Sequence, residues 1–272
     1  MRKSLLSAFE QFLSVLLRMA RAFMIGKSKR VEFLVVGVQK GGTTALDYYL
    51  RQHPEICMAS RKEVHFFDNE LLQKFPKSIR KLYYHSFFAG CGDDKLWGEV
   101  TPIYAWWPKC IERMREYNPF FKIIMVLRDP VHRAYSHWNM ERQRGLENEP
   151  FSVCIRRNGA KQSICRVNSY VSRGFYSEQV RRLKSYFQDK QLLFIKQEDL
   201  LNSLHSTMSR VTVFLEVSPM DSLEVKKIHA RKYNSPISFY DEKYLRELYY
   251  EDITKLEKEL GWDLSQWKKV SQ

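Results

Sequence analysis

The sequence predicts an α/β fold, a single domain with a central parallel sheet and helices on both faces. Apolar strand candidates recur at 33–37, 122–127 and 192–196, with helical patterns between them. A glycine-rich turn joins the first strand to the next helix, and 44% of the 272 residues are hydrophobic, enough for a substantial core. Because parallel strands need long crossovers, this alternation indicates a sheet of four or five strands.

The helical patterns fall in the connections between these strands. They cover roughly 43–53, 109–117, 131–144, 176–188 and 200–215, and the chain closes with a helix predicted over 241–267. Gly261 stands where a C-terminal cap is expected within that last segment.

The N-terminal residues 1–30 are predicted to form an amphipathic helix outside the main domain, 31–272. Apolar side chains recur there at three- and four-residue steps, opposite basic and polar ones. A membrane-spanning helix needs about 20 mostly apolar residues, and Glu10 and Arg18 interrupt this segment. Two interpretations follow: residues 1–26 lie on a membrane surface or a partner, or they pack on their own domain.

The charge balance indicates anionic partners. The net charge is +14, from 45 Lys+Arg against 31 Asp+Glu. A phosphorylated cofactor, an acidic glycan or an anionic membrane would each suit this balance. The chain has no recognisable nucleic-acid module and no basic tail, so nucleic acid is not a predicted partner.

The five cysteines form no CxxC pair, which argues against a zinc or redox site. Their odd number favours unpaired thiols in a reducing compartment, with a Cys154–Cys165 disulfide as the alternative. The sequence also lacks an N-x-[ST] glycosylation site. Together these features favour the cytoplasm, at a membrane face if residues 1–26 bind lipid.

The stretch from Glu32 to Leu50 predicts an anion-binding turn. A buried strand leads into the Gly37–Gly42 turn, and Thr43 opens a helix, so backbone N–H groups point at one spot. The triphosphatase pattern G-x-x-x-x-G-K-[ST] would place a lysine before the Thr, but here the lysine is Lys40, inside the turn. The structural alternative is a strand-to-helix turn that merely requires glycine.

A second segment, Lys62–Phe67, pairs a carboxylate with an imidazole. If this segment is extended, Glu63 and His65 share one face, with about 6–7 Å between their Cα atoms. A carboxylate flanked by apolar residues and a cation suits a general base, because burial raises its pKa and the cation lowers it. A solvated edge strand is the structural alternative.

A third segment is the strand Lys122–Leu127 with the residues after it. Arg128 is placed at the carboxyl end of the strand, where open α/β sheets bind ligands, and its planar fork matches phosphate oxygens. Asp129 and Pro130 suit the cap and first position of the next helix, and Ser136 falls in the second turn. The rival interpretation makes Asp129 the metal-binding carboxylate of a triphosphatase.

These three segments, in this order, resemble the sulfotransferases that use 3′-phosphoadenosine 5′-phosphosulfate (PAPS). The Lys-Gly-Gly-Thr-Thr turn resembles their phosphosulfate loop, and R-D-P-x-x-R-A-x-S resembles their 3′-phosphate site. E-V-H-F-F resembles the heparan sulfate branch, and the resemblance spans about 32–267. It implies PAPS as donor, 3′-phosphoadenosine 5′-phosphate (PAP) as product, no metal, and a hydroxyl acceptor on a glycan.

The resemblance also implies roles for individual residues. It makes Glu63 the catalytic base, with Lys40 and His65 as its catalytic partners. The implied nucleotide contacts are Lys40, Gly41, Gly42, Thr43, Thr44, Arg128, Ser136, Tyr176, Arg231 and Lys232. Arg133 is expected instead to pair at the surface.

One departure concerns Val100, which stands where the heparan enzymes carry a lysine that assists catalysis. Either Lys40 works with His65 alone, or another basic residue replaces that lysine. Two other functions stay open: a P-loop kinase or triphosphatase, and a non-catalytic membrane-associated module on a transferase scaffold that binds glycan or lipid without transfer. The Golgi lumen, where the animal carbohydrate enzymes of this family act, is the alternative to the cytoplasm.

Overall fold

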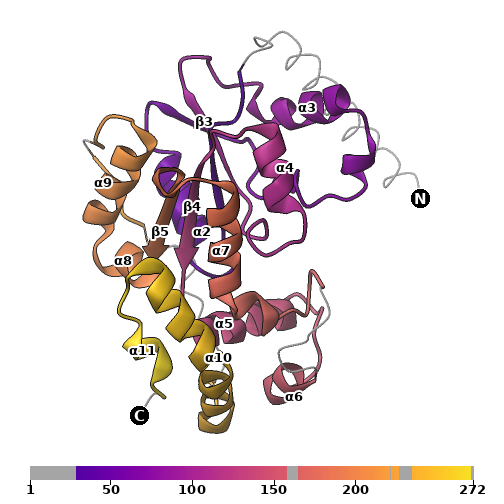
Figure 1. Ribbon diagram of the computed structural model, residues 1–272, viewed down its shortest axis with the longest axis vertical. Helices are drawn as coiled ribbons and strands as arrows, with labels where there is room; N and C mark the ends of the chain where they lie inside the picture. The colour runs from indigo at the N-terminus through magenta and orange to yellow at the C-terminus, as the bar shows by residue number, and fades with distance from the viewer. Residues whose placement is uncertain (1–28, 158–164, 221, 227–234, 271–272) are drawn as a thin grey trace.

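The computed structural model describes residues 29–157, 165–220, 222–226 and 235–270 (Figure 1). Nearly all of the predicted N-terminal helix, together with Arg231 and Lys232, lies outside the described residues. The elements, with 3₁₀ turns marked η, run in chain order: β1 (Phe33–Gly37), α2 (Thr43–Leu50), β2 (Ile56–Met58), η1 (Leu72–Lys74), α3 (Lys77–His85), η2 (Ser86–Phe88), β3 (Leu96–Val100), α4 (Cys110–Tyr117), β4 (Lys122–Leu127), α5 (Pro130–Gln143), α6 (Phe151–Arg156), η4 (Ser172–Gly174), α7 (Tyr176–Tyr186), η5 (Asp189–Gln191), β5 (Leu192–Lys196), α8 (Gln197–Asn202), α9 (Leu204–Leu215), α10 (Phe239–Leu260) and α11 (Ser265–Lys268).

The sheet is parallel throughout, with the strand order β2-β3-β1-β4-β5. Strand β1 lies at the centre, with β3 on one side and β4 on the other. The predicted parallel sheet and three of its strands are therefore confirmed. The sequence analysis missed β2 and β3 because neither forms a long apolar run: β2 has three residues and β3 contains Gly98 and Glu99.

Helices cover both faces of the sheet, as predicted (Figure 1). Side chains alternate along β1, so that Phe33 and Val35 belong to one core cluster while Leu34 and Val36 belong to the other. Helices α2, α8 and α9 pack into the first cluster. Helices α4, α5, α7 and α10 pack into the second. Both faces are buried, which explains the continuous apolar runs of β1 and β4.

Two of the predicted helices are each divided in the structure. The segment predicted at 200–215 is α8 followed by α9, with Ser203 between them. The segment predicted at 241–267 is α10 followed by α11. Gly261 ends α10 in the left-handed region (φ 64°), which confirms its predicted role as a C-terminal cap.

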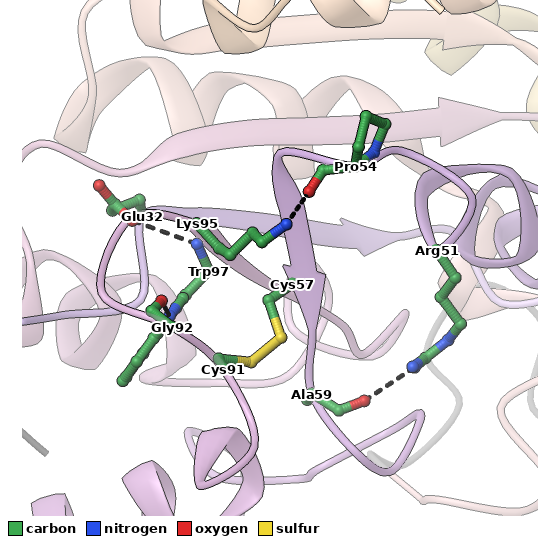
Figure 2. The surroundings of a disulfide bond; sticks show 9 residues. All are labelled: Glu32, Arg51, Pro54, Cys57, Ala59, Cys91, Gly92, Lys95 and Trp97. Carbon is green, nitrogen blue, oxygen red and sulfur yellow. Dashed lines mark hydrogen bonds between the residues drawn. A yellow bond between two sulfur atoms is a disulfide. The ribbon is translucent and has the colours of Figure 1, made fainter.

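A disulfide bond joins Cys57 on β2 to Cys91 in the turn before β3 (Figure 2). Their Cα atoms lie 5.8 Å apart because the two strands are neighbours in the sheet. Cys154 and Cys165 both remain thiols. Both sequence predictions on cysteine, unpaired thiols throughout and a Cys154–Cys165 disulfide, were therefore wrong. The bonded pair is separated by 34 residues, so the sequence gives no local signal for it.

Candidate active site

The turn between β1 and α2 is packed directly against the end of β4. The N–H of Val38 donates to the carbonyl of Val126 at 2.7 Å. A Cβ on Gly41 would lie 2.8 Å from that same carbonyl oxygen, and Gly42 has a φ of 98°. Both positions thus require glycine, the first for close packing and the second for its backbone angle. The first N–H groups of α2, which have no acceptor within the helix, point out of this turn.

Lys40 lies in this turn with a φ of 70°. Its carbonyl accepts a hydrogen bond from Nη1 of Arg128 at 3.0 Å. Its Nζ lies 3.8 Å from the sulfur of Met140 on α5. The structure thus brings Lys40 and Arg128 together although 88 residues separate them.

The position of this pair follows from the strand order. Lys40 follows β1 and Arg128 follows β4, and these two strands are neighbours at the centre of the sheet. After β1 the chain crosses to β2 and β3 on one side of it, and from β3 it crosses back to β4 and β5 on the other side, so the connections diverge here. Open α/β sheets bind ligands in the crevice at such a switch point.

Helix α5 starts as its sequence predicts. The Asp129 carboxylate accepts from the N–H groups of Val131 and His132, and Pro130 is the first helical residue. Ser136 lies one turn further on and is 4% exposed. The sequence analysis expected Arg133 at the surface, but the structure buries it fully. Its guanidinium donates to the carbonyl of Tyr170.

Two buried groups hold the Arg128 backbone in place. The hydroxyl of Tyr176 donates to the carbonyl of Arg128 at 2.9 Å. Arg246 on α10 donates to the carboxylate of the next residue, Asp129, at 2.7 Å. Tyr176 is fully buried, so in this conformation it supports Arg128 and offers no surface to a nucleotide.

The segment with Glu63 and His65 is not the extended strand that the alternation predicted. Both residues have left-handed backbones, with φ angles of 60° and 57°. The side chains of Val64 and Phe66 are buried, and they anchor the segment to the core. The two polar side chains nevertheless meet, with 3.7 Å between Nε2 of His65 and Oε2 of Glu63.

Charged neighbours keep Glu63 ionised and His65 protonated. Burial raises the pKa of Glu63, but His65 and Lys62, whose Nζ lies 2.8 Å from Oε1, outweigh it and lower that pKa to about 2. The hydrogen bond between Nδ1 of His65 and Asp68, at 2.9 Å, helps raise the pKa of His65 to about 9. At neutral pH the site therefore contains a carboxylate that is available to accept a proton.

The buried carboxyl of Glu99 supports the segment that carries Glu63 and His65. Glu99 accepts hydrogen bonds from the hydroxyls of Tyr84, Thr101 and Tyr104. The oxygen of Tyr104 in turn accepts the N–H of Phe66 at 2.8 Å. Burial raises the pKa of Glu99 to about 7.

A chain of contacts links the β1–α2 turn to the Glu63 segment. Arg173 donates to the side chain of Gln39, next to Lys40. It also donates to the carbonyl of Arg166 at 2.8 Å, and Arg166 donates to the carboxylate of Asp68. Since Asp68 holds His65, residues from four separate parts of the chain form one connected site.

Two tryptophans, Trp106 and Trp107, support this chain of contacts. The guanidinium of Arg166 lies 4.3 Å from the ring centre of Trp107, and that of Arg173 lies 4.6 Å from Trp106. Both rings are half-buried. They fix the arginines by cation–π contact.

Comparison with known proteins identifies the family. The family profile described as "Sulfotransferase domain" matches residues 30–259. The chain belongs to the sulfotransferase family. A crystal structure of a sulfotransferase from Alicyclobacillus acidocaldarius shares 27% identity, covers 89% of this chain and all of its own, and superposes with a TM-score of 0.75.

Curated relatives add detail about this sulfotransferase. Human heparan sulfate glucosamine 3-O-sulfotransferase 3B1 is 28% identical over 70% of the chain and 47% of its own length. The membrane-associated sulfotransferase kil1 of Dictyostelium discoideum is 34% identical over 41% of the chain and 23% of its own. The chain thus spans about half the length of the first of these relatives, and less of the second.

Sequence analysis missed four residues of the sulfotransferase site. Lys62 and Asp68 directly flank the E-V-H-F-F segment, so their position was a usable signal. Arg166 lies in no recognisable pattern. Arg173 begins the segment Arg173–Tyr176, which resembles a family segment near the nucleotide, but only Tyr176 was predicted as a contact. Both arginines reach the site through the fold.

The late basic pair of the sulfotransferase, Arg231 and Lys232, cannot be placed, since both lie outside the described residues. The described chain resumes at Ser235, whose carbonyl accepts from the hydroxyl of Tyr135 at 2.8 Å, beside Ser136. Within the described ranges, no group of three or more His, Cys, Asp or Glu residues is arranged to hold a metal ion. None of the helices described there is long and apolar enough to span a bilayer.

Proposed function

We propose that this sulfotransferase transfers a sulfuryl group from PAPS to a hydroxyl group of a carbohydrate. The observation that carries the proposal is the contact between Arg128 and the carbonyl of Lys40. It joins the two phosphate-binding segments at one crevice. The contacts through Arg173 and Arg166 connect that crevice to Glu63 and His65.

The residues of the crevice fit the two anionic ends of PAPS. The cradle at Gly41, which a Cβ would fill, lets the backbone approach a phosphosulfate closely, and the start of α2 supplies N–H donors. We assign Lys40, Gly41, Gly42, Thr43 and Thr44 to this end. Arg128 and Ser136 are assigned to the 3′-phosphate, because a guanidinium fork and a hydroxyl match its oxygens.

Glu63 acts as the base in this proposal. The acceptor oxygen forms a bond to sulfur while the bond from sulfur to the phosphate oxygen breaks, giving a sulfate ester and PAP. The hydroxyl proton passes to the Glu63 carboxylate. A pKa of about 2 makes Glu63 a weak base, but a hydroxyl oxygen that is bonding to sulfur becomes strongly acidic, so a weak base suffices. Lys40 stabilises the charge that grows on the leaving phosphate.

Lys62 is proposed as the second cation of the site. Val100, at the position of the family's lysine, is 1% exposed and packs in the core, so no cation acts from there. The ammonium of Lys62 lies 2.8 Å from Glu63 instead. It therefore supplies positive charge at the reacting group from a different part of the chain.

A glycan acceptor is proposed on two grounds. One is the human relative, whose name states action on heparan sulfate glucosamine. The other is Arg166, which lies over the ring of Trp107, is 43% exposed, and is linked to His65 through Asp68. Cations next to aromatic rings suit an acidic sugar.

An oxidising compartment is proposed for this protein. The prediction of a cytoplasmic location rested on the lack of glycosylation sites and of a clean spanning helix, together with unpaired thiols, and the Cys57–Cys91 bond removes the thiol argument. Disulfides persist in oxidising compartments and are rare in the cytosol. The Golgi lumen, the alternative location, is therefore the favoured one.

The proposed function is tested with PAPS labelled on the sulfuryl group and a panel of acidic glycans, neutral glycans and phenols. Label should enter an acidic glycan without added metal. Glu63→Gln should lower the rate by about 10²–10⁴-fold and leave PAP affinity nearly unchanged. Lys40→Ala should abolish transfer and weaken PAP binding. Label appearing only in phenols would refute the carbohydrate acceptor.

The kinase or triphosphatase alternative predicts magnesium-dependent ATP turnover, which the same protein is tested for directly. The non-catalytic module predicts glycan binding without label transfer. Binding of PAP with a Kd unaffected by Lys40→Ala would contradict the assignment of the loop, whatever the acceptor.

A further inference from the structure

A basic and apolar surface surrounds the 3₁₀ turn η1 and helix α3. Residues 71–81 include four basic side chains and no acidic one. Three large apolar side chains in the same stretch are exposed: Leu71 by 68%, Phe75 by 49% and Ile79 by 45%. The η1–α3 surface is defined as Leu71, Lys74, Phe75, Lys77, Ile79, Arg80 and Lys81.

A pocket of about 130 Å³ opens beside this surface, between α3 and α4. The aromatic rings of Phe66 and Tyr117 line its interior. Four cationic side chains, Lys77, Arg80, Lys81 and Arg113, also line it. The pocket thus combines an apolar interior with a cationic border, which suits an anion carried on an apolar body.

Positive charge is crowded around this pocket. Burial and the nearby charge of Arg30 lower the pKa of Lys81. Among the described residues that line the pocket, Glu116 is the one carboxylate, and it pairs with Lys77 at 2.5 Å. Glu70, just outside the lining, pairs with Arg113 at 2.7 Å, so the positive charge centres on Arg80 and Lys81. A bound anion would relieve this repulsion.

We propose that the η1–α3 surface docks on an anionic membrane, whose anionic leaflet faces the oxidising compartment proposed above. The exposed apolar side chains enter the headgroup region, the lysines face the negative surface, and a lipid phosphate occupies the pocket. An acidic polysaccharide would match the charges but would leave Leu71, Phe75 and Ile79 in water. The apolar side chains therefore favour the membrane.

The docking surface lies away from the phosphate-binding turn, although Phe66 in its pocket belongs to the segment that carries Glu63 and His65. The hydroxyl of Tyr117, in the pocket, accepts from the N–H of Val31, just before β1 begins. The pocket is therefore near the amino ends of the strands, whereas Lys40 and Arg128 follow the carboxyl ends. In Figure 1, α3 and α4 accordingly lie far from α5, which starts after Arg128. Docking leaves the crevice open to substrates.

The test measures partition of the full-length protein onto vesicles of phosphatidylcholine, with and without about 30 mol% phosphatidylserine. The triple variant Leu71→Ser, Phe75→Ser, Ile79→Ser should bind anionic vesicles at least about tenfold more weakly than wild type. The double variant Lys74→Glu, Lys77→Glu should show a loss of similar size. Both should keep wild-type activity on a soluble acceptor.

Matched controls lie on other elements of the protein. Leu201 on α8 is 68% exposed, as is Leu71, so Leu201→Ser removes an equal apolar side chain elsewhere. Lys243→Glu with Lys258→Glu on α10 makes the same change in net charge at exposed positions. Both controls should partition like wild type. Every variant retains residues 1–26, so the differences report on the η1–α3 surface alone.

Equal partition of all variants would overturn the proposal. Equal binding of wild type to neutral and to anionic vesicles would also overturn it. Loss of binding to a heparin column by Lys74→Glu, Lys77→Glu, with vesicle binding unchanged, would assign the surface to an acidic polysaccharide. Neither result depends on PAPS or on sulfuryl transfer, so this test and that of the proposed function fail independently.

Discussion

Nε2 of His65 lies 3.7 Å from Oε2 of Glu63, although both residues have positive φ angles. In an extended strand the two side chains would share a face through alternation. Here they meet because the core holds Val64 and Phe66 while Asp68 holds the imidazole. The contact thus depends on packing around the segment, and it sets the charge state of the proposed base.

His65→Asn should change the pH dependence of the reaction. The imidazolium contributes to the low pKa of Glu63, so its removal should raise that pKa toward the ordinary value near 4.5. Wild-type kcat/KM should then stay flat down to about pH 4, whereas the variant should lose activity as Glu63 becomes protonated. If the kcat/KM profiles of wild type and His65→Asn superimpose on the acid side, the assigned interaction between His65 and Glu63 is contradicted.

The same imidazole should stabilise the fold below alkaline pH. Because the folded-state pKa of His65 is raised to about 9, its contribution is fully present below the unfolded value of 6.5 and is lost as pH rises through 9. Urea unfolding of wild type and His65→Asn should therefore differ at pH 6 and converge above pH 9 to within about 0.5 kcal/mol. A difference independent of pH would argue against this linkage.

Lys62→Ala should slow transfer without weakening nucleotide binding. The ammonium lies beside Glu63 and far along the chain from the phosphate loop, so its removal should act on kcat, by about ten- to a hundredfold. Lys95, which donates to the carbonyl of Pro54 just before β2, provides the control, and Lys95→Ala should have wild-type kcat. A rise in the Kd for PAP equal to the fall in kcat would instead place Lys62 at the nucleotide.

Arg128→Ala should abolish the preference for PAP over the nucleotide without its 3′-phosphate. Hydrogen bonds to charged groups contribute about 1.5–3 kcal/mol, so PAP affinity should fall about ten- to a hundredfold. Calorimetric titration of the two nucleotides measures the preference. Arg115→Ala, which removes an exposed arginine that also donates to a carbonyl, is the control. Retained discrimination would show that another residue recognises the 3′-phosphate.

Glu99→Gln should remove a pH dependence of stability. Burial raises the folded-state pKa of Glu99 to about 7 from 4.5, so its contribution is fully present below pH 4.5 and is lost as pH rises through 7. The loss amounts to about 3 kcal/mol across this range. Gln keeps an acceptor for Tyr84 and Tyr104 and is neutral throughout. As a control, Glu251→Gln on the exposed face of α10 should leave the pH profile of wild-type stability unchanged. If the free energy of unfolding of Glu99→Gln falls with pH as steeply as that of wild type, the prediction is refuted.

The disulfide predicts a definite thiol count. Denatured protein should react with a thiol reagent at three cysteines before reduction and at five after it. Replacing Cys57 and Cys91 with serine should lower the free energy of unfolding by about 3–4 kcal/mol, because the 34-residue loop is then unconstrained in the unfolded chain. Five reactive thiols without reduction would remove the argument for an oxidising compartment.

Local sequence determined the parts of this protein that depend on neighbours in the chain. The apolar runs of β1 and β4 were visible because strands buried on both faces must be apolar throughout. The edge strand β5 was visible from its apolar run although most of it is only partly buried. Asp129, Pro130 and Gly261 end or begin helices through their own hydrogen bonds and backbone angles. The glycines of the β1–α2 turn indicated an anion site because the turn, too, is set by residues that are neighbours in the chain.

Tertiary structure decided what depends on residues distant in the chain. Short β2 and β3 become strands because a parallel neighbour pairs with them, and their pairing brings Cys57 to Cys91. Arg166 and Arg173 join the site through contacts that no local pattern encodes. Sequence could name the charged groups Glu63 and Lys40, but their pKa values, supports and relative positions follow from burial and long-range packing, which only the folded chain creates.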